Sequence, residues 1–279
     1  MRIAAFGDIH SNHIALRACL DAVEKTGVDG VALLGDFVSD CACPQKTLAL
    51  MKEIAERHPC WTIRGNREEY MIDHADGRNC WRDSSQSGSL LYTYENLTDE
   101  DIAYFRSLPI FMKVEMDGCP PFEICHGAQW QTRVMMLPGT EAMDEAFSRM
   151  ETDLMLCAHT HEAFIVERDG KTIVNGGALG LPTQECADAA YAVIELEGGR
   201  WIPKLMRAKY DADAVVREFH ESGFMERGHV WARCMAKSIQ TGHEYSVDCL
   251  ERVGKYSKEC GLPFDCEALW QRAAEELGV

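Results

Sequence analysis

Basic residues are scarce in this sequence relative to acidic ones. The chain of 279 residues contains 28 Lys and Arg against 45 Asp and Glu, which gives a formal net charge of −17 with neutral histidine. General nucleic-acid binding needs clustered Lys and Arg that neutralise phosphates, and anionic lipid surfaces attract the same side chains. The charge balance therefore argues against nucleic acid and against a membrane surface as general partners.

Long apolar runs and a disulfide-like cysteine pattern are also missing. No stretch of about 18 apolar residues occurs, so we expect no membrane-spanning helix. The first residues, MRIAAFGDIH, have an acidic residue at position 8 and no apolar segment typical of a signal peptide. The 13 cysteines are an odd number and are scattered, as at Cys19, Cys125 and Cys157. They favour free thiols in a reducing compartment, and we expect a cytoplasmic protein.

The first 65 residues alternate short apolar runs with helical periodicity. Apolar runs over residues 2–6, 31–34 and 60–63 predict strands, and residues 12–25 and 44–57 carry apolar side chains at helical spacing. This alternation is typical of a parallel sheet with right-handed crossovers. The N-terminal part of the chain therefore predicts an α/β fold.

The rest of the chain divides into a strand-rich part and a helical part. A capping box at Thr98 and Asp101 predicts a helix, residues 140–150 predict another, and residues 76–89 read as a loop. From Asp211 the pattern is helical to the end. We expect one domain over residues 1–210 and accessory helices packed on it over 211–279. Further strands are predicted at 110–116, 122–125, 153–157, 163–168, 172–175, 190–196 and 201–205.

Metal-binding side chains follow five of the predicted strands. Ligands of open α/β sheets bind at the carboxyl ends of the strands, where the loops converge. Four imidazoles, two carboxylates and one amide suit two divalent transition metals, with manganese first and iron, zinc, cobalt or nickel as alternatives. A Gly-Asp pair alone is ordinary turn chemistry, but the combination favours a dinuclear site. The residues are Asp8, His10, Asp36, Asn66, His126, His159 and His161.

Five short motifs carry a resemblance to a known family. They are GDIHSN at 7–12, GDFVSD at 35–40, GNRE at 65–68, HGA at 126–128 and AHTH at 158–161. Together they resemble the calcineurin-like metallophosphoesterases, and within them the small bacterial branch of YfcE-like phosphodiesterases. The resemblance runs from residue 1 to about residue 240 and implies a four-layer α/β/β/α sandwich of two mixed sheets, here with a C-terminal helical extension.

The resemblance also implies roles for the metal-binding residues. One metal would be held by Asp8, His10 and His161, and the other by Asn66, His126 and His159. Asp36 would bridge both metals. Two such ions activate a bridging hydroxide for in-line attack on phosphorus. We therefore expect a metal-dependent phosphoesterase, specifically a phosphodiesterase acting on a small soluble substrate, with Asp36, Asn66, Arg67 and His126 as the catalytic residues.

Arg67 departs from the family pattern, which often has histidine after the motif-three asparagine. Arginine cannot serve as a general acid, but it can clamp a phosphate or a departing oxyanion. We therefore expect esters with good leaving groups to be preferred, with His13 or a metal-bound water as the alternative acid. The competing interpretation is that Arg67 points outward and pairs with Glu68, Glu69 or another acid.

The remaining expectations concern substrate and partners. Arg67, His13 and Asn12 are candidate substrate-binding residues, although Asn12 also suits a helix cap. Two alternative functions stay open: a non-catalytic metal-binding interaction scaffold of the same fold, and a dinucleoside polyphosphate hydrolase or protein phosphatase. The helices from residue 211 would pack on the sandwich, cover the site or form a homodimer contact.

Overall fold

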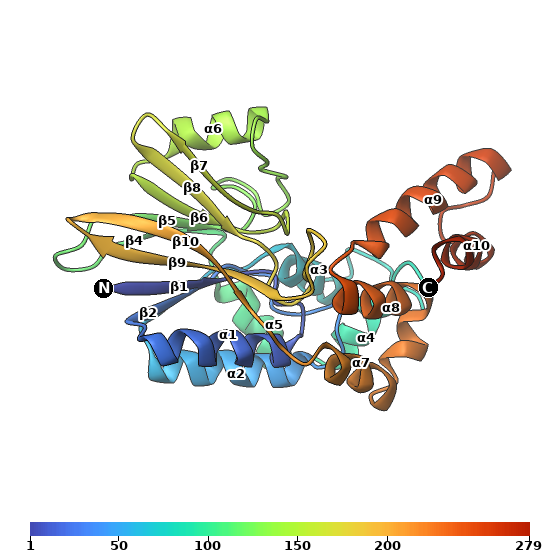
Figure 1. Ribbon diagram of the computed structural model, residues 1–279. Coiled ribbons are helices and arrows are strands. Elements are labelled where there is room, and N and C mark those ends of the chain that lie inside the picture. The colour runs from blue at the N-terminus through green and yellow to red at the C-terminus, as the bar shows by residue number, and fades with distance from the viewer.

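The computed structural model describes all 279 residues and contains two five-stranded sheets stacked face to face (Figure 1). In the first sheet the N-terminal strands run parallel, and the two long strands pair antiparallel beside them. Its order is β10 (Arg200–Ala208), β9 (Ala189–Glu197), β1 (Arg2–Phe6), β2 (Gly30–Leu33) and β3 (Cys60–Thr62).

The second sheet is also mixed. Its three central strands run parallel, and an antiparallel strand lies at each edge. The order is β4 (Phe111–Val114), β5 (Phe122–Cys125), β6 (Leu154–Cys157), β8 (Lys171–Gly176) and β7 (Ala163–Arg168). All ten strands lie at or within a few residues of their predicted positions.

Helices cover both outer faces of the sheet pair. Strand β1 shows why, because its side chains alternate between the two faces. Ala4 and Phe6 pack with α1 (His13–Thr26) and α2 (Pro44–Arg57), whereas Ile3 and Ala5 pack against the second sheet. On the far side, α6 (Glu141–Arg149) packs on the outer face of the second sheet. The predicted four-layer α/β/β/α sandwich of two mixed sheets is confirmed.

Three further helices lie between β3 and β4, and only one was predicted. Helix α5 (Asp99–Ser107) begins at the expected capping box, in which Thr98 accepts from the backbone N–H of Asp101 and the Asp101 side chain accepts in return. The periodicity did not indicate α3 (Asn66–Ala75) or α4 (Gly88–Glu95). The loop predicted before α4 extends over most of its expected range.

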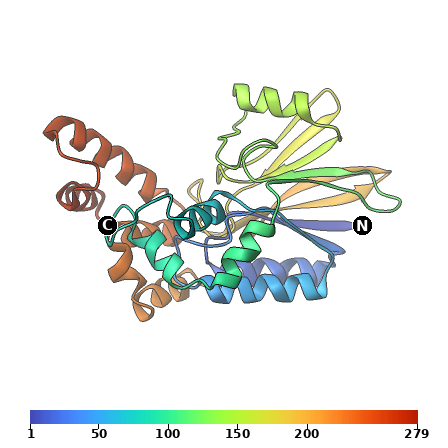
Figure 2. The same ribbon diagram turned by 180° about the vertical axis from the view of Figure 1, so that it is seen from behind.

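The C-terminal segment is helical, as expected. It consists of α7 (Ala212–Glu221), α8 (Phe224–Thr241), α9 (Tyr245–Cys260) and α10 (Glu267–Leu277). Tyr92 of α4 packs with Phe219 and Phe224 of this segment, and Figure 2 shows α4 beside α8 from behind. Helices α8, α9 and α10 share a separate core around Trp270. A domain boundary at residue 210 stays a prediction.

No helix combines the length and hydropathy that a membrane span requires.

Candidate metal centre

All seven predicted ligands follow strands whose carboxyl ends meet at one edge of the sandwich. Asp8, Asp36 and Asn66 follow β1, β2 and β3 of the first sheet, and His126 and the His159–His161 pair follow β5 and β6 of the second. Each sheet therefore contributes only part of the group.

The backbone at this edge is in an unusual conformation. Left-handed φ angles between 50° and 72° occur at five of the seven residues. Such angles are uncommon outside glycine, although Asp, Asn and His tolerate them best, and they concentrate at functional sites. The sharp turns aim the side chains back toward the strand ends. The five residues are Asp8, His10, Asp36, His159 and His161.

One group of ligand atoms is formed by Asp8, His10 and His161, whose donor atoms all lie within 4.8 Å of one another. The two Nε2 atoms of His10 and His161 are 3.1 Å apart, and Nε2 of His161 lies 3.6 Å from Oδ1 of Asp8. This is the set assigned to one metal from the sequence.

The second group contains Asp36, His126 and His159, again with donor atoms within 4.8 Å. Nε2 of His126 lies 3.4 Å from Oδ1 of Asp36 and 3.1 Å from Oδ1 of Asn66. The other carboxylate oxygen of Asp36, Oδ2, lies 3.9 Å from Nε2 of His10 in the first group. Asp36 therefore faces both groups, as a shared ligand must.

Oxygen atoms lie behind two of the imidazoles, and one of them accepts a hydrogen bond. Nδ1 of His126 donates to the carbonyl of Leu34 at 2.7 Å, and Nδ1 of His10 lies 3.1 Å from Oδ2 of Asp40. A proton on Nδ1 leaves Nε2 as the lone-pair nitrogen, and such outer partners fix the ring of a metal-binding histidine. Both Nε2 atoms face the carboxylate cluster.

The charges at the site fit bound cations. Asp8 and Asp36 are 0% and 2% exposed. Burial raises the pKa of Asp8, and the nearby Asp36 charge raises it further. Burial lowers the pKa of the His126 imidazole, but Asp36 and Asp8 outweigh it and raise that pKa to about 9. Two buried carboxylates without a cation are costly, and the nitrogen and oxygen donors present suit transition metals.

Glu68 holds the loops that carry Asp36 and Asn66. Its carboxylate is fully buried and accepts from the backbone N–H groups of Asp36 at 2.8 Å, Phe37 at 2.7 Å and Gly65 at 2.8 Å. Glycine is needed at position 65 because a Cβ there would overlap the Asp36 carboxylate. Glu68 belongs to the GNRE motif, but no sequence pattern indicated this role.

Arg67 points into the site, so the outward interpretation is wrong. Its guanidinium Nη2 lies 3.0 Å from Oδ2 of Asp40, and Nε lies 3.9 Å from Oδ2 of Asp36. Glu68 is occupied by backbone N–H groups, and Glu69 pairs with other arginines. Burial lowers the pKa of Arg67, but Asp40 and Asp36 reverse the effect and keep it charged.

The two other candidate substrate-binding residues have different neighbours. The Asn12 side chain caps α1 by accepting from the N–H of Ala15 at 3.0 Å and donates to the carbonyl of Gly180 at 2.9 Å. His13 Nε2 bonds to Glu218 of α7 at 3.0 Å. A substrate-binding role for either stays a prediction, and Glu218 is a partner that no sequence pattern indicated.

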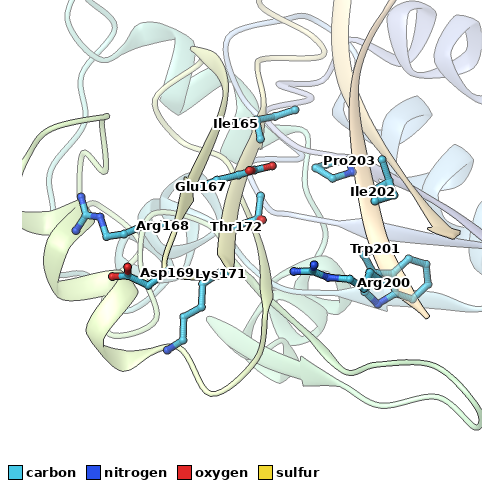
Figure 3. Close-up of a pocket in the computed structure, with 11 residues that line it drawn as sticks. Ile165, Glu167, Arg168, Asp169, Lys171, Thr172, Arg200, Trp201, Ile202 and Pro203 are labelled. Carbon is cyan, nitrogen blue, oxygen red and sulfur yellow. The ribbon is translucent and has the colours of Figure 1, made fainter. Parts of the chain in front are cut away.

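A separate surface groove lies at the opposite end of the second sheet. It has a volume of about 440 Å³ and is lined by Glu167, Lys171 and Thr172 of the β7–β8 hairpin and by Arg200 and Trp201 of β10 (Figure 3). Strand β8 begins at this groove and ends beside the metal-binding residues. The groove shares no residue with the candidate centre.

Sequence comparison matches the chain to one protein family and to one curated protein. The sequence profile of the calcineurin-like phosphoesterase superfamily domain matches residues 1–199. An uncharacterized protein of Methanocaldococcus jannaschii is 22% identical over 226 residues, which cover 75% of this chain and 88% of that protein.

Structure comparison finds the same fold in many solved proteins, two of which follow. A metallophosphoesterase from Sphaerobacter thermophilus superposes with a TM-score of 0.69 at 21% identity, covering 87% of this chain and 100% of the other. A hypothetical protein from Pyrococcus horikoshii superposes with a TM-score of 0.73 at 18% identity, covering 84% and 97%. Because the sequence identities are this low, the two superpositions show only that the fold is shared.

Proposed function

Because the chain belongs to the calcineurin-like phosphoesterase superfamily, we propose that it is a metal-dependent phosphoesterase that hydrolyses a small phosphodiester. The observation that carries the proposal is Asp36, whose two carboxylate oxygens face two separate groups of nitrogen and oxygen donors. Two divalent ions bound there would supply Lewis-acid activation of water and of phosphoryl oxygens.

Different residues of the chain would bind the two ions. Asp8, His10 and His161 would hold one ion and Asn66, His126 and His159 the other, with Asp36 shared. Asn66 offers a neutral amide oxygen, which leaves its ion more electrophilic than a further carboxylate would. The buried Glu68 carboxylate keeps the Asp36 and Asn66 loops in register and excludes water behind them.

Arg67 is the only fixed cation beside the cluster and would bind phosphate oxygens. It remains charged, so it stabilises a departing oxyanion without donating a proton. We therefore propose a preference for esters whose leaving groups need no protein acid. Manganese is the first metal to test, followed by iron, zinc, cobalt and nickel. The YfcE-like branch within the superfamily stays a prediction.

The test is hydrolysis of p-nitrophenyl phosphodiesters and monoesters by purified protein, first stripped of metal and then reloaded with each ion. We expect turnover that depends on added metal and is lost in Asp36→Asn. Metal content measured on the same samples separates failed binding from failed chemistry. Full activity of Asp36→Asn with manganese would overturn the mechanism.

The same experiment separates the alternatives. Protein that binds two metal equivalents yet hydrolyses no ester in a broad panel would favour the interaction scaffold. Hydrolysis restricted to dinucleoside polyphosphates or phosphoproteins would favour the other enzymatic alternatives.

A further inference from the structure

The metal-binding residues differ in how exposed they are. Five of the seven predicted ligands are at most 4% exposed, whereas His159 and His161 are partly exposed. Both histidines line a pocket of about 370 Å³, together with Arg67. A substrate that contacts these two histidines and Arg67 would therefore lie in this pocket.

The opposite wall of this pocket is built by the C-terminal helices. Trp231 and Met235 of α8 and Val247 and Leu250 of α9 line it, facing Leu181 of the loop before β9. Trp231 is fixed there because its indole Nε1 donates to Oδ1 of Asp40 at 2.8 Å. The same carboxylate also contacts Arg67. Asp40 therefore connects the C-terminal helices to the metal-binding side of the pocket.

The pocket lining is mainly apolar beyond the metal side, and its remaining charges are negative. Glu162 follows the metal-binding pair and Glu244 begins α9, and both line the pocket. The two carboxylates therefore border the same cavity. Additional anionic groups on a ligand in this pocket would be repelled by these carboxylates.

From this arrangement we infer that α8 and α9 form a specificity wall, which receives an apolar organic group of the phosphoester and rejects groups that carry further negative charge. The inference rests on the proposed function and narrows its substrate class. A cavity of about 150 Å³ accepts benzene, so the pocket has room for an aromatic ring beside a phosphoryl group. Polyphosphate chains are disfavoured because they would bring anions to Glu162 and Glu244.

The test compares three diesters that share a p-nitrophenyl leaving group and differ in the second group: methyl, phenyl or 4-carboxyphenyl. For the native protein with manganese, we expect kcat/KM for the phenyl ester to exceed that for each of the others by about tenfold or more. Equal values for the three esters would overturn the inference while leaving phosphodiesterase activity intact. Hydrolysis of none of them would overturn the proposed function itself, and the inference with it.

Two variants locate the effect in the wall. Val247→Glu adds a carboxylate to it and should raise KM for the phenyl ester about tenfold with kcat retained. The matched control is Leu262→Glu, because Leu262 has the same 43% exposure as Val247, lies between α9 and α10, and does not line the pocket.

Glu244→Gln should raise kcat/KM for the carboxyphenyl ester severalfold relative to the phenyl ester. Metal content and circular dichroism establish that each variant is folded.

If Val247→Glu has the same KM as Leu262→Glu, or if Glu244→Gln leaves the relative rates of the phenyl and carboxyphenyl esters unchanged, the wall does not select the substrate.

Discussion

Trp231 of α8 donates a hydrogen bond to Asp40, a residue 191 positions earlier in the chain, at 2.8 Å. Oδ2 of the same carboxylate lies 3.1 Å from Nδ1 of His10 and 3.0 Å from Nη2 of Arg67. Asp40 is 1% exposed. One buried carboxylate therefore links a predicted metal ligand, the cationic side chain at the site and the C-terminal helices.

Asp40→Asn should weaken metal binding. An amide keeps the size of the side chain but removes the charge that orients His10, and loss of such outer partners costs about 10- to 100-fold in metal affinity or activity. Titration of the stripped protein with manganese measures the change. Asp117→Asn, on the exposed β4–β5 turn, is the control and should bind like the native protein. Equal affinities for the two variants would contradict the role of Asp40.

Arg67→Ala should lower kcat by about 10²- to 10³-fold, the usual effect of losing one preorganised donor at the reacting group. Arg67→Lys should recover part of the loss, since it restores charge without the planar fork. Arg133→Ala is a matched control, because Arg133 also stacks on Tyr70 but pairs with Glu69 and Asp73 at the surface. Steady-state kinetics on one p-nitrophenyl diester gives the comparison.

Glu68→Gln should destabilise the fold by about 1–3 kcal/mol, because at least one of three buried N–H donors then faces an amide NH₂ in place of an oxygen. Urea unfolding monitored by circular dichroism measures the free energy of unfolding. Glu100→Gln, an exposed residue of α5, should leave that free energy unchanged. A Glu68→Gln protein as stable as this control would show that the carboxylate is dispensable.

Removal of metal should lower the melting temperature. Ligands that bind only the folded state stabilise it by about 2.7 kcal/mol at 100 times their dissociation constant, which corresponds to about 5–10 °C for a chain of this size. Calorimetry after chelation, and again after reloading with manganese, measures the shift. The melting temperature should recover when the metal is restored. Equal melting temperatures for the metal-free and the metal-loaded protein would contradict the assigned ligands.

His243 should make stability depend on pH. Hydrogen bonds to Asp248 at 2.9 Å and to Glu185 at 2.6 Å raise the pKa of His243 above its ordinary value of 6.5. The stabilisation is complete below about pH 6.5 and is lost as the pH rises through the raised folded-state pKa. His243→Gln should therefore lower the melting temperature at pH 5.5 and have little effect at alkaline pH. His220→Gln, on the exposed end of α7 without an ion pair, should show no such difference.

The strands and ligand positions could be predicted because their signals are local. Each ligand lies within four residues of the end of a strand, as Asp8 lies just after β1 and His126 just after β5. Helix α3 was missed because its first turn, Asn66 to Glu69, is polar and belongs to the metal motif. Helix α4 contains Gly, Ser, Thr and Tyr, which have low helix propensity.

The contacts between distant parts of the chain could not be predicted from the sequence pattern. Trp231 reads as one aromatic residue of a helix, and only the fold brings its indole to Asp40. Glu218 similarly lacks a ligand spacing, although it meets His13 across 205 positions. Trp81, which the sequence left in an irregular loop, stacks on His74 with ring centroids 4.3 Å apart.

The division of the ligands between the two sheets has a mechanical consequence. Asp8, Asp36 and Asn66 follow strands of one sheet, and His126 and His159 follow strands of the other. A bound ion would therefore cross-link two layers that are otherwise joined by apolar packing and a few hydrogen bonds, such as that from His126 to the Leu34 carbonyl. Pulling the sheets apart would break coordination bonds first, and a chain that has formed only its first sheet cannot yet retain metal. We therefore expect metal to bind only after the two sheets have come together, so that bound metal would report an assembled sandwich.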